Sequence, residues 1–543
     1  MTFSHRYKCA FILGLLFAAT GFHACTRKFE DYNTDPNKLK QDMLEYDNLK
    51  ISAFFSQLEK NVIPAGNSAT DEINQYQVSE NLQGDIWSGY MGVTNNWNSG
   101  RNNSNYNLIP GWTSVAFNNM FNGVMPAWKE IKKETADKNP NNTAFRGVFA
   151  MAQIIKVFAA SRTTDMYGPL PYFSFGNGGT QTPYDGQQEI YASFFKDLDS
   201  SMNTLRDFLS QSNGASPKND FDLIYGGDYS RWLKFANTLK LRLAMRIVYA
   251  DAALAKQRAE QTVSNGFGFI EVNANNAMYK GNTLFILLNP IQWIADNYGD
   301  IRMGAPMESF LKGYNDPRLP LLFNAVSGEY RGIRTGIDIV NKSPYAERFS
   351  SMKIASADPL PWMVAAESYF LRAEGALRGW NMGGTAQSFY EQGVTTAFDQ
   401  VKATGAAAYL ANSTAKPAPY TDPVATSGAN NVAATSADLP TITIKWAEGD
   451  GFETKLERIM TQKWIALYPD GQEAWSEFRR TRYPRIFPVV RNYSGGTIDQ
   501  KKQIKRIPFT QNEYQTNAQG VAKGVQLLGG ADNGGTALWW DKK

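Results

Sequence analysis

Apolar residues recur at helical spacing, with a period near 3.6 residues, through much of this 543-residue chain. Gly and Pro end the pattern in places, as at Gly168 and Pro169. The segments that the pattern predicts as helices are 43–58, 145–160, 189–209, 230–247, 252–263, 453–467 and 472–482. Residues 484–543 lack it and are predicted to be loops and short extended pieces. The expected fold class is therefore all-α.

Consecutive predicted helices stand close enough in the chain to pack as pairs. Within 366–399, large and small residues fall at the offsets of the 34-residue tetratricopeptide template. These residues are Phe370, Ala373, Leu377, Ala386, Tyr390 and Gly393. We therefore expect tetratricopeptide-like helix pairs, joined by loops longer than those of regular repeats and carrying a face of long, irregular loops.

The N-terminus has the pattern of a secretory signal. Arg6 and Lys8 precede an uninterrupted apolar run, 10–19, and the small Ala24 stands directly before Cys25. A run this short cannot cross a bilayer as a helix, which takes about 20 residues. We expect cleavage in front of Cys25, at a site that resembles the lipobox of bacterial lipoproteins, whose cysteine is acylated.

This cleavage site sets the predicted division of the chain. A signal peptide, a lipidated polar tether, one helical domain and a surface insertion within that domain are expected at 1–24, 25–42, 43–543 and 403–450. The insertion is predicted from its Ala, Thr, Ser, Pro and Asn content. Acyl chains on Cys25 would contribute about 0.8 kcal/mol per buried methylene, so the chain would be held on a membrane without crossing it.

Overall composition is that of a soluble globular protein, with 43% hydrophobic and 20% charged residues. The net charge of +4 falls to about +2 once Arg6 and Lys8 leave with the signal peptide. A value this near zero, without a basic run, argues against nucleic acid as a partner.

The positions of cysteine and histidine exclude whole classes of chemistry. Cys9, Cys25, His5 and His23 are the only such residues, and all lie at or before the predicted cut. The mature chain would have no histidine and no free thiol. Triad catalysis, imidazole bases, disulfides and zinc sites built from His or Cys are thereby excluded. We predict no cofactor and assign no metal-ligating residues, and the sequence leaves open whether a structural metal ion binds. The enzyme class left open uses carboxylates alone, above all a glycosidase.

Residues 87–128 have the most unusual composition in the chain, with four tryptophans and a run of asparagines. Asn favours turns, so an irregular loop is expected here. Aromatic faces cover apolar C–H surface, while amides and guanidinium groups bond hydroxyls or amides. The residues that we predict to contact a ligand are Trp87, Tyr90, Asn95, Asn96, Trp97 and Arg101. Trp112 and Trp128, which flank helical runs, could equally be core.

A second, weaker candidate stretch follows later in the chain. Trp293, Tyr298 and Arg302 lie where Asn297 and Gly299 again suggest irregular backbone, and they are predicted as further ligand contacts.

The basic residues of segment 230–247 are not predicted to bind a ligand. Arg231, Lys234, Lys240, Arg242 and Arg246 lie largely off the apolar stripe. Such a face is most often solvated or engaged in intramolecular salt bridges, and is not predicted as a binding patch.

Several segments resemble the SusD/RagB group of nutrient-binding lipoproteins from Bacteroidetes. They are 29–37 (FEDYNTDPN), 165–172 (DMYGPLPY), 231–246, 314–320 (YNDPRLP), 359–380, 462–484, 506–509 (RIPF) and 538–541 (LWWD). The resemblance implies an α-helical fold with four tetratricopeptide-like helix pairs. It also implies a surface-exposed outer-membrane lipoprotein that delivers captured oligomers to a SusC-like TonB-dependent transporter.

Three functional hypotheses remain, the last of them a purely structural partner of the transporter with no ligand contact of its own. The leading hypothesis is non-catalytic binding of an oligosaccharide or a peptide, coupled to its import. The alternative is a lipid-anchored glycosidase with two catalytic carboxylates. Aromatic rings and amides suit both sugars and peptides, so the sequence does not choose between the two ligands.

Overall fold

The computed structural model describes residues 49–543, apart from 67–70, 218 and 283–284. The predicted signal peptide, Cys25 and the tether lie outside the described residues, as do residues 43–48 of the first predicted helix.

The chain divides into two units, Met1–Ala53 and Phe54–Lys543. The first five residues of helix α4 (Leu49–Lys60) are the described part of the first unit. The second unit holds all the other elements.

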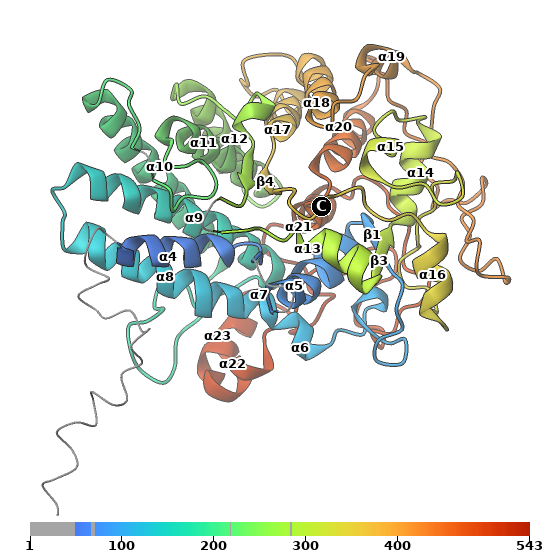
Figure 1. Ribbon diagram of the computed structural model, residues 1–543, viewed down its shortest axis with the longest axis horizontal. Helices are drawn as coiled ribbons and strands as arrows, with labels where there is room; N and C mark the ends of the chain where they lie inside the picture. The colour runs from blue at the N-terminus through green and yellow to red at the C-terminus, as the bar shows by residue number, and fades with distance from the viewer. Residues whose placement is uncertain (1–48, 67–70, 218, 283–284) are drawn as a thin grey trace, which may run out of the picture. The chain divides into compact units, whose positions relative to one another are not determined.

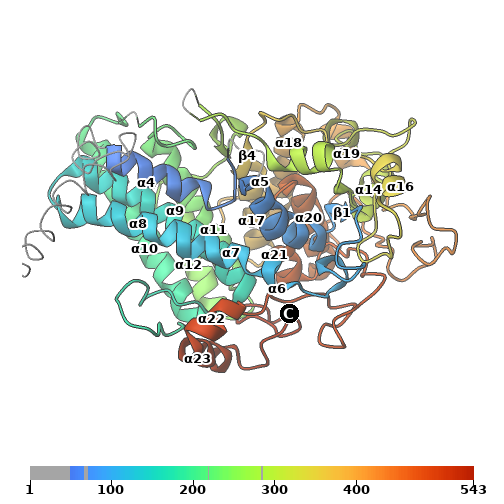
Figure 2. The same ribbon diagram turned by 60° about the horizontal axis from the view of Figure 1, so that its bottom comes forward.

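Consecutive long helices of the second unit pack against each other as pairs. The pairs are α9 (Thr143–Tyr167) with α10 (Gln187–Gln211), α11 (Tyr229–Arg246) with α12 (Ala252–Ser264), α17 (Ala365–Leu377) with α18 (Ala386–Gln400), and α20 (Phe452–Leu467) with α21 (Gly471–Thr481). Figures 1 and 2 show α9 to α12 gathered on one side, with α17, α18, α20 and α21 beside them. The predicted all-α fold is confirmed.

The α17–α18 crossing explains the small residue of the tetratricopeptide spacing. Gly393 lies against the ring of Phe370, and a Cβ on Gly393 would stand 2.8 Å from the ring's Cζ. The Tyr390 ring packs one turn away, with its centroid 6.4 Å from that of Phe370. A larger residue at 393 would force the two helices apart.

Helix α9 runs through the core. It is long and apolar enough to cross a membrane by length and composition, but 72% of its most apolar window is buried inside the fold. We therefore interpret α9 as the core helix of a folded domain. A Cβ added at Gly147 would lie only 2.3 Å from the Tyr229 hydroxyl oxygen. Glycine at this position therefore allows Tyr229 to pack directly against α9.

Shorter helical elements connect the pairs. They are α5 (Asp71–Tyr76), η2 (Gln77–Asp85), η3 (Asn103–Asn105), α6 (Pro110–Thr113), α7 (Val115–Asn118), η4 (Asn119–Val124), α8 (Met125–Lys132), η5 (Lys133–Asp137), η6 (Asn273–Asn275), α13 (Pro290–Gln292), η7 (Trp293–Tyr298), α14 (Ala305–Gly313), α15 (Leu319–Leu322), α16 (Lys342–Arg348), α19 (Ala406–Ala411), α22 (Gln511–Thr516) and α23 (Ala518–Leu528).

Four short strands form two antiparallel ribbons among the described residues. Strand β1 (Met91–Val93) pairs with β3 (Ile301–Met303), and β2 (Ala277–Tyr279) pairs with β4 (Leu360–Met363). The β1–β3 register sets Met91 opposite Met303. Each ribbon therefore joins segments that lie far apart in the sequence.

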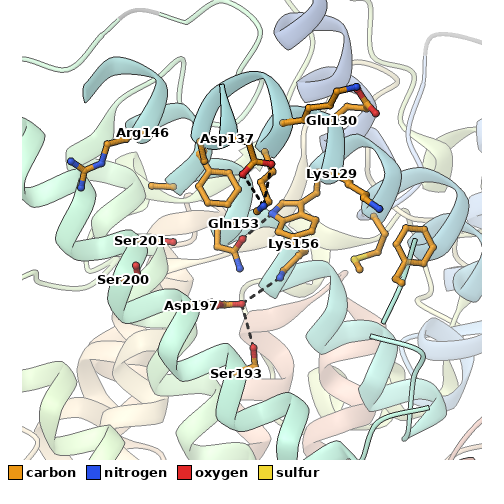
Figure 3. A pocket seen from close by; sticks show the side chains of 18 of the residues that line it. Lys129, Glu130, Asp137, Arg146, Gln153, Lys156, Ser193, Asp197, Ser200 and Ser201 are labelled. Atoms are coloured by element: carbon orange, nitrogen blue, oxygen red, sulfur yellow. Dashed lines mark hydrogen bonds and ion pairs between the residues drawn. The ribbon is translucent and has the colours of Figure 1, made fainter. Parts of the chain in front are cut away.

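Helices α8, η5, α9 and α10 enclose a groove with a volume of about 900 Å³ (Figure 3). Trp128, which the sequence left open between core and site, is half-buried in this groove. It lies on α8, well apart from the Asn-rich loop.

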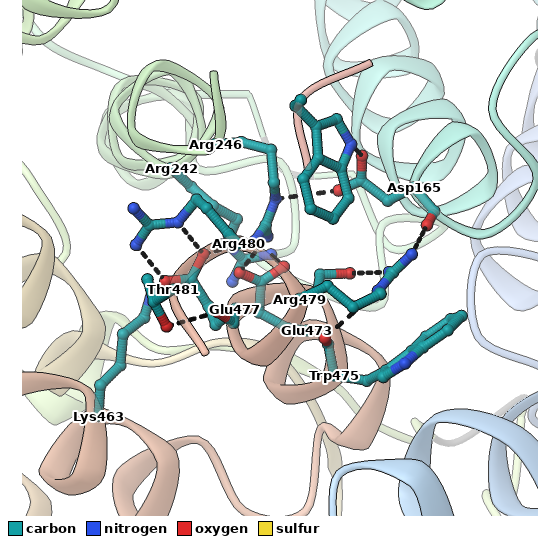
Figure 4. A network of polar contacts seen from close by, with 12 residues as sticks. Asp165, Arg242, Arg246, Lys463, Glu473, Trp475, Glu477, Arg479, Arg480 and Thr481 are labelled. Atoms are coloured by element: carbon teal, nitrogen blue, oxygen red, sulfur yellow. Dashed lines mark hydrogen bonds and ion pairs between the residues drawn. The ribbon is translucent and has the colours of Figure 1, made fainter. Parts of the chain in front are cut away.

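A buried cluster of charges joins α9, α11, α20 and α21 (Figure 4), and Arg480 extends it to Glu374 on α17. Arg246 reaches Asp165 at 3.1 Å and Glu473 at 2.5 Å, and it also pairs with Glu477. Arg480 donates to Glu374 at 2.7 Å and bonds the second Glu477 oxygen at 2.6 Å. Of the basic residues predicted on 230–247, Arg246 is thus engaged in intramolecular salt bridges.

At Glu477, charge pairing outweighs the cost of burial. Burial alone would raise the pKa of the Glu477 carboxyl, but Arg480, Lys463 and Arg246 together hold that pKa well below its ordinary value. Because Glu477 faces three cations, removal of its carboxylate would leave several buried charges short of partners.

The C-terminal part of the chain departs from the prediction. Residues 511–528 form α22 and α23, so the expectation of loops alone was wrong there. The Thr510 side chain accepts the Glu513 amide at 3.3 Å and caps α22, while Gly524 packs close to Tyr184 and Phe509. Tertiary contact stabilises these short helices, which the local pattern does not reveal.

The 403–450 segment is irregular apart from α19. Tyr420 and Val432 exchange backbone hydrogen bonds within it, and both pack with Ala305 and Phe487. The segment is thereby anchored to α14 and to the C-terminal part of the chain.

Candidate functional site

The β1–β3 ribbon brings the two sequence-predicted ligand stretches together. Because the strands are antiparallel, the loop after β1 and helix η7 before β3 meet at the same end of the ribbon. Beyond the paired residues, Thr94 donates its amide to the Asp300 carbonyl at 3.0 Å and its hydroxyl to the Gly299 carbonyl at 2.6 Å. Figure 1 shows β1, β3 and the adjoining α13 side by side.

The asparagines of the loop mostly hold its own backbone. Asn98 donates to the Arg101 carbonyl at 2.7 Å, Asn102 to the Trp97 carbonyl at 3.2 Å and Asn105 to the Gly100 carbonyl at 2.5 Å. Asn98 and Ser99 adopt left-handed backbone, for which Asn is the better suited of the two. The predicted irregular loop is confirmed for 94–109, apart from η3, and most of its amides bond its own backbone. For 110–128 the prediction was wrong, because α6, α7, η4 and the start of α8 make that part helical.

Trp87 and Tyr90 do not belong to an exposed platform. Trp87 is 2% exposed, donates its indole N–H to the Asn103 carbonyl at 3.0 Å and packs on Trp475 at 4.8 Å between ring centroids. Tyr90 is fully buried, and its hydroxyl donates to the Trp464 carbonyl. The prediction that both face a ligand was wrong, because α20 and α21 cover this side of the segment.

Trp97 stands at the surface with an aromatic neighbour. It is half-buried, and its ring meets Trp112 edge to face, with centroids 5.8 Å apart and the planes at 90°. Trp112, which the sequence left open, is also half-buried, at the start of α6. Edge-to-face contact holds one ring against another while part of each remains accessible.

Arg101 contacts Tyr493, a residue that the sequence analysis did not identify. Its guanidinium lies 5.2 Å from the ring centroid of Tyr493, which is 37% exposed. Tyr493 is tied to the loop, because its amide donates to the Asn105 carbonyl at 2.8 Å. Its hydroxyl donates to Asp338 at 3.3 Å.

The η7 side contributes two half-buried aromatic residues, Trp293 and Tyr298. The Tyr298 hydroxyl donates to the Asn74 side chain at 3.2 Å. Asn74 lies on α5 and is exposed. Trp97, Trp293 and Tyr298 thus come from two segments that share one end of the ribbon.

Arg302 is turned toward the backbone of the fold. Its Nε donates to the Ala346 carbonyl at 2.8 Å, and one terminal nitrogen donates to the Ala295 and Ile301 carbonyls, each at 2.6 Å. Burial lowers the pKa of this guanidinium, and Asp296 and Asp300 partly offset that effect. Arg302 therefore holds η7 and α16 in place, and its direct contact with a ligand stays a prediction.

Asp300 ties the two halves of the site together. It is 7% exposed and accepts from Gln77 at 2.8 Å, from Asn95 at 3.4 Å and from Lys342 at 2.6 Å. This places the Asn95 amide at the junction, whereas the neighbouring Asn96 is exposed. The aromatic rings and amides at this end of the ribbon are thus held on backbone that Asp300 fixes in place.

No group of three or more His, Cys, Asp or Glu side chains that could hold a metal ion occurs among the described residues. Several donors near the ribbon, among them the Thr94 hydroxyl, the Arg302 guanidinium and the Lys342 ammonium, already bond within the protein. What this surface offers a ligand is ring faces and hydrogen bonds.

Comparison with known proteins identifies a family that matches this chain. A family model described as SusD-like, SusD and RagB outer membrane lipoprotein, matches residues 31–541. No match was found among curated protein sequences.

Solved structures resemble the chain over nearly their whole length. A chitin-binding SusD homologue from Flavobacterium johnsoniae is 41% identical, with a TM-score of 0.84, over 91% of this chain and 98% of that one. A SusD homologue from Bacteroides uniformis is 39% identical with a TM-score of 0.79, over 91% and 99% of the two chains. One from Bacteroides vulgatus is 35% identical with a TM-score of 0.83, over 92% and 99%.

Proposed function

This chain belongs to the SusD-like family of outer membrane lipoproteins, and from that premise we propose that it binds a nutrient oligosaccharide at the cell surface without cleaving it. The bound oligomer is then passed to a SusC-like TonB-dependent transporter. Anchoring is through acylated Cys25, and the helical domain begins after the tether.

One observation carries the binding proposal: aromatic rings and amides converge at the end of the β1–β3 ribbon. Trp97, Trp293 and Tyr298 are only half-buried there, beside Asn95 and the exposed Asn96. A sugar presents flat C–H faces to such rings and hydroxyls to such amides. Asp300 and Lys342 brace this frame before a ligand arrives, which reduces the ordering cost of binding.

A saccharide ligand is favoured over a peptide by the relatives. The homologue from Flavobacterium johnsoniae, 41% identical to this chain, is described as chitin-binding. We therefore propose a glycan as the ligand class, with chitin oligosaccharides as the first candidates.

Binding without hydrolysis is supported by the pairing of two carboxylates near the site, Asp300 and Asp338. A glycosidase needs two carboxyl groups that flank the scissile bond, one of them a proton donor. Asp300 is bonded by Lys342 at 2.6 Å, and Asp338 pairs with Arg491 at 2.9 Å. Both are engaged by cations within the fold. Release of new reducing ends, abolished by a single Asp or Glu substitution, would overturn this part of the proposal.

Replacing Trp97 with Ala should weaken glycan binding about thirtyfold, since loss of a well-placed aromatic anchor costs about 2 kcal/mol. Its ring is half-buried, so the free energy of unfolding should fall by only about 1 kcal/mol. Calorimetric titration with chitin and other neutral oligosaccharides, together with denaturant unfolding, measures both quantities.

The matched control for Trp97→Ala is Tyr514→Ala, which removes an aromatic ring that is 47% exposed on α22. Equal affinity of the Trp97→Ala and unaltered proteins would remove Trp97 from the site. Binding of peptides but of no glycan in the panel would contradict the proposed ligand class.

Replacing Cys25 with Ala should move the protein from the membrane to the soluble fraction with its fold unchanged. Within the described residues, the one helix apolar enough to span a bilayer is α9, and it is mostly buried. Fractionation in cells that lack the transporter partner measures the effect. Retention of the Cys25→Ala protein on membranes would show that another anchor exists.

A further inference from the structure

The groove of Figure 3 lies apart from the proposed glycan site. Its volume of about 900 Å³ falls within the range of small-molecule sites, roughly 300–1,000 Å³. It is lined from α8, η5, α9, α10 and the loop 172–177, and it shares no residue with the β1–β3 end. Figures 1 and 2 both place α8, α9 and α10 on the opposite side of the second unit from β1.

The floor of the groove is fixed by contacts within the protein. Lys156 is 5% exposed, and its ammonium lies 4.2 Å from the Trp128 ring centre and 4.8 Å from that of Tyr172. Asp197 accepts from this ammonium at 3.3 Å. Gln153 accepts the Trp128 indole N–H at 2.8 Å through its oxygen, which commits the oxygen and fixes the direction of the amide nitrogen. A ligand would therefore meet a floor that is already ordered.

The walls combine ring faces with hydroxyls. Phe149 and Phe175 are half-buried, and Phe173 is 49% exposed, one of the few large apolar side chains with so much exposed area. Ser200 and Ser201 line the same space as Gln153 (Figure 3). Aromatic rings with a small number of hydroxyl and amide groups are the usual lining of a small-molecule site, and a sugar can use both kinds of group.

Charge around the groove is unbalanced in favour of cations. Five basic and three acidic side chains line it. Each acidic residue has a basic partner: Lys132 pairs with Asp137 at 2.9 Å, Lys133 with Glu130 at 3.7 Å and Lys156 with Asp197 at 3.3 Å.

Of the five basic residues that line the groove, Lys129 and Arg146 have no carboxylate partner among the described residues. Lys129 donates to the Gly176 carbonyl, which leaves its positive charge uncompensated, and Arg146 is exposed. Figure 3 shows them toward opposite ends of the groove. The surplus charge is thus located where two ends of an extended ligand would lie.

We propose that this groove is a second binding site, specific for saccharides that carry a carboxylate, such as uronic acid residues. The sugar ring would lie on the phenylalanine faces, with its hydroxyls at Gln153 and the serines and its carboxylate at Arg146 or Lys129. This inference rests on the proposed glycan-binding function and adds a charge preference to it. The charge imbalance favours an acidic sugar over the neutral ligands proposed for the β1–β3 end.

The probes are short oligomers of galacturonate, glucuronate and mannuronate, each compared with its methyl ester. Esterification removes the charge and leaves the sugar ring intact. Binding is followed by fluorine NMR of the full chain with Cys25→Ala, labelled with 5-fluorotryptophan. The Trp128 signal is identified by its loss in Trp128→Phe, and the Trp97 signal by its loss in Trp97→Phe.

At least one free acid should shift the Trp128 signal and bind about tenfold or more tightly than its ester, since charge-assisted hydrogen bonds are the strong ones. The double change Arg146→Glu with Lys129→Glu should abolish this preference. Lys523→Glu, an exposed reversal on α23, is the matched control and should retain it.

Failure of every free acid to shift the Trp128 signal would overturn the inference, as would equal binding of acid and ester. A shift of the Trp97 signal by neutral oligosaccharides in the same samples would then leave the proposed function standing. Absence of both shifts would remove both proposals. An acidic peptide that occupies the groove while no saccharide does would also contradict the second site.

Discussion

Replacing Trp87 with Ala should lower the free energy of unfolding by about 3 to 5 kcal/mol, the cost of truncating a buried tryptophan. Trp87 is 2% exposed and packs on Trp475 at 4.8 Å. Truncation would open a cavity beside α21 and leave the Asn103 carbonyl without the indole donor that bonds it at 3.0 Å. Denaturant unfolding followed by circular dichroism measures the change.

Trp97→Ala is the natural comparison, because the two tryptophans lie in the same segment and differ in exposure. Trp87→Ala should lose stability and keep glycan affinity in whatever fraction stays folded, whereas Trp97→Ala should show the reverse. A Trp87→Ala protein that unfolds at the same denaturant concentration as the unaltered chain would contradict the core assignment.

Replacing Glu477 with Ala should cost about 3 to 5 kcal/mol of stability, because it removes one partner of a buried ion cluster. Its carboxylate accepts a hydrogen bond from Arg480 at 2.6 Å, and it forms ion pairs with Lys463 at 3.2 Å and with Arg246. Those three cations would stay buried with fewer partners. Denaturant midpoints of the variant and the unaltered protein measure the loss.

Acid pH provides a second test of the Glu477 prediction. The cations hold the pKa of Glu477 below its ordinary value, so its contribution is present above that value and is lost as the pH falls. The stability gap between the two proteins should be full at pH 7 and shrink below about pH 4. Glu453→Ala, which removes a partner of the surface pair with Lys543, is the control and should cost about 1 kcal/mol or less. A similar small loss for Glu477→Ala would show that the cluster contributes little.

Local periodicity was enough to place the long helices. Predicted segments at 145–160, 189–209 and 453–467 lie within α9, α10 and α20. A helix that buries one stripe records that burial along its own sequence. Gly393 could be placed at a crossing for the same reason, since a close approach demands a small residue.

Burial of individual aromatic residues could not be predicted in this way. Trp87, Tyr90 and Trp97 occur within one short stretch of similar composition, but α20 and α21 cover only the first two. The covering residues lie far along the chain, so no local pattern separates the cases. Tyr493 was missed for the same reason, since it reaches the loop only through the folded C-terminal part.

The role of the basic residues on α11 also depended on distant partners. From the sequence alone, arginines that lie off the apolar stripe of a helix could be exposed to solvent or engaged in intramolecular salt bridges. Arg246 proved to be 1% exposed, because Glu473, Glu477 and Asp165 arrive from other helices.

The central ion cluster also dictates an order of events while the chain is being made. Asp165 and Arg246 are synthesised long before Glu473 and Trp540, whose indole donates to Asp165 at 2.8 Å. Until those late residues arrive, closing the centre would take two charges out of water with too few partners, at several kcal/mol per ion. We therefore expect the helices on either side of the centre to pack together only after the last residues are made.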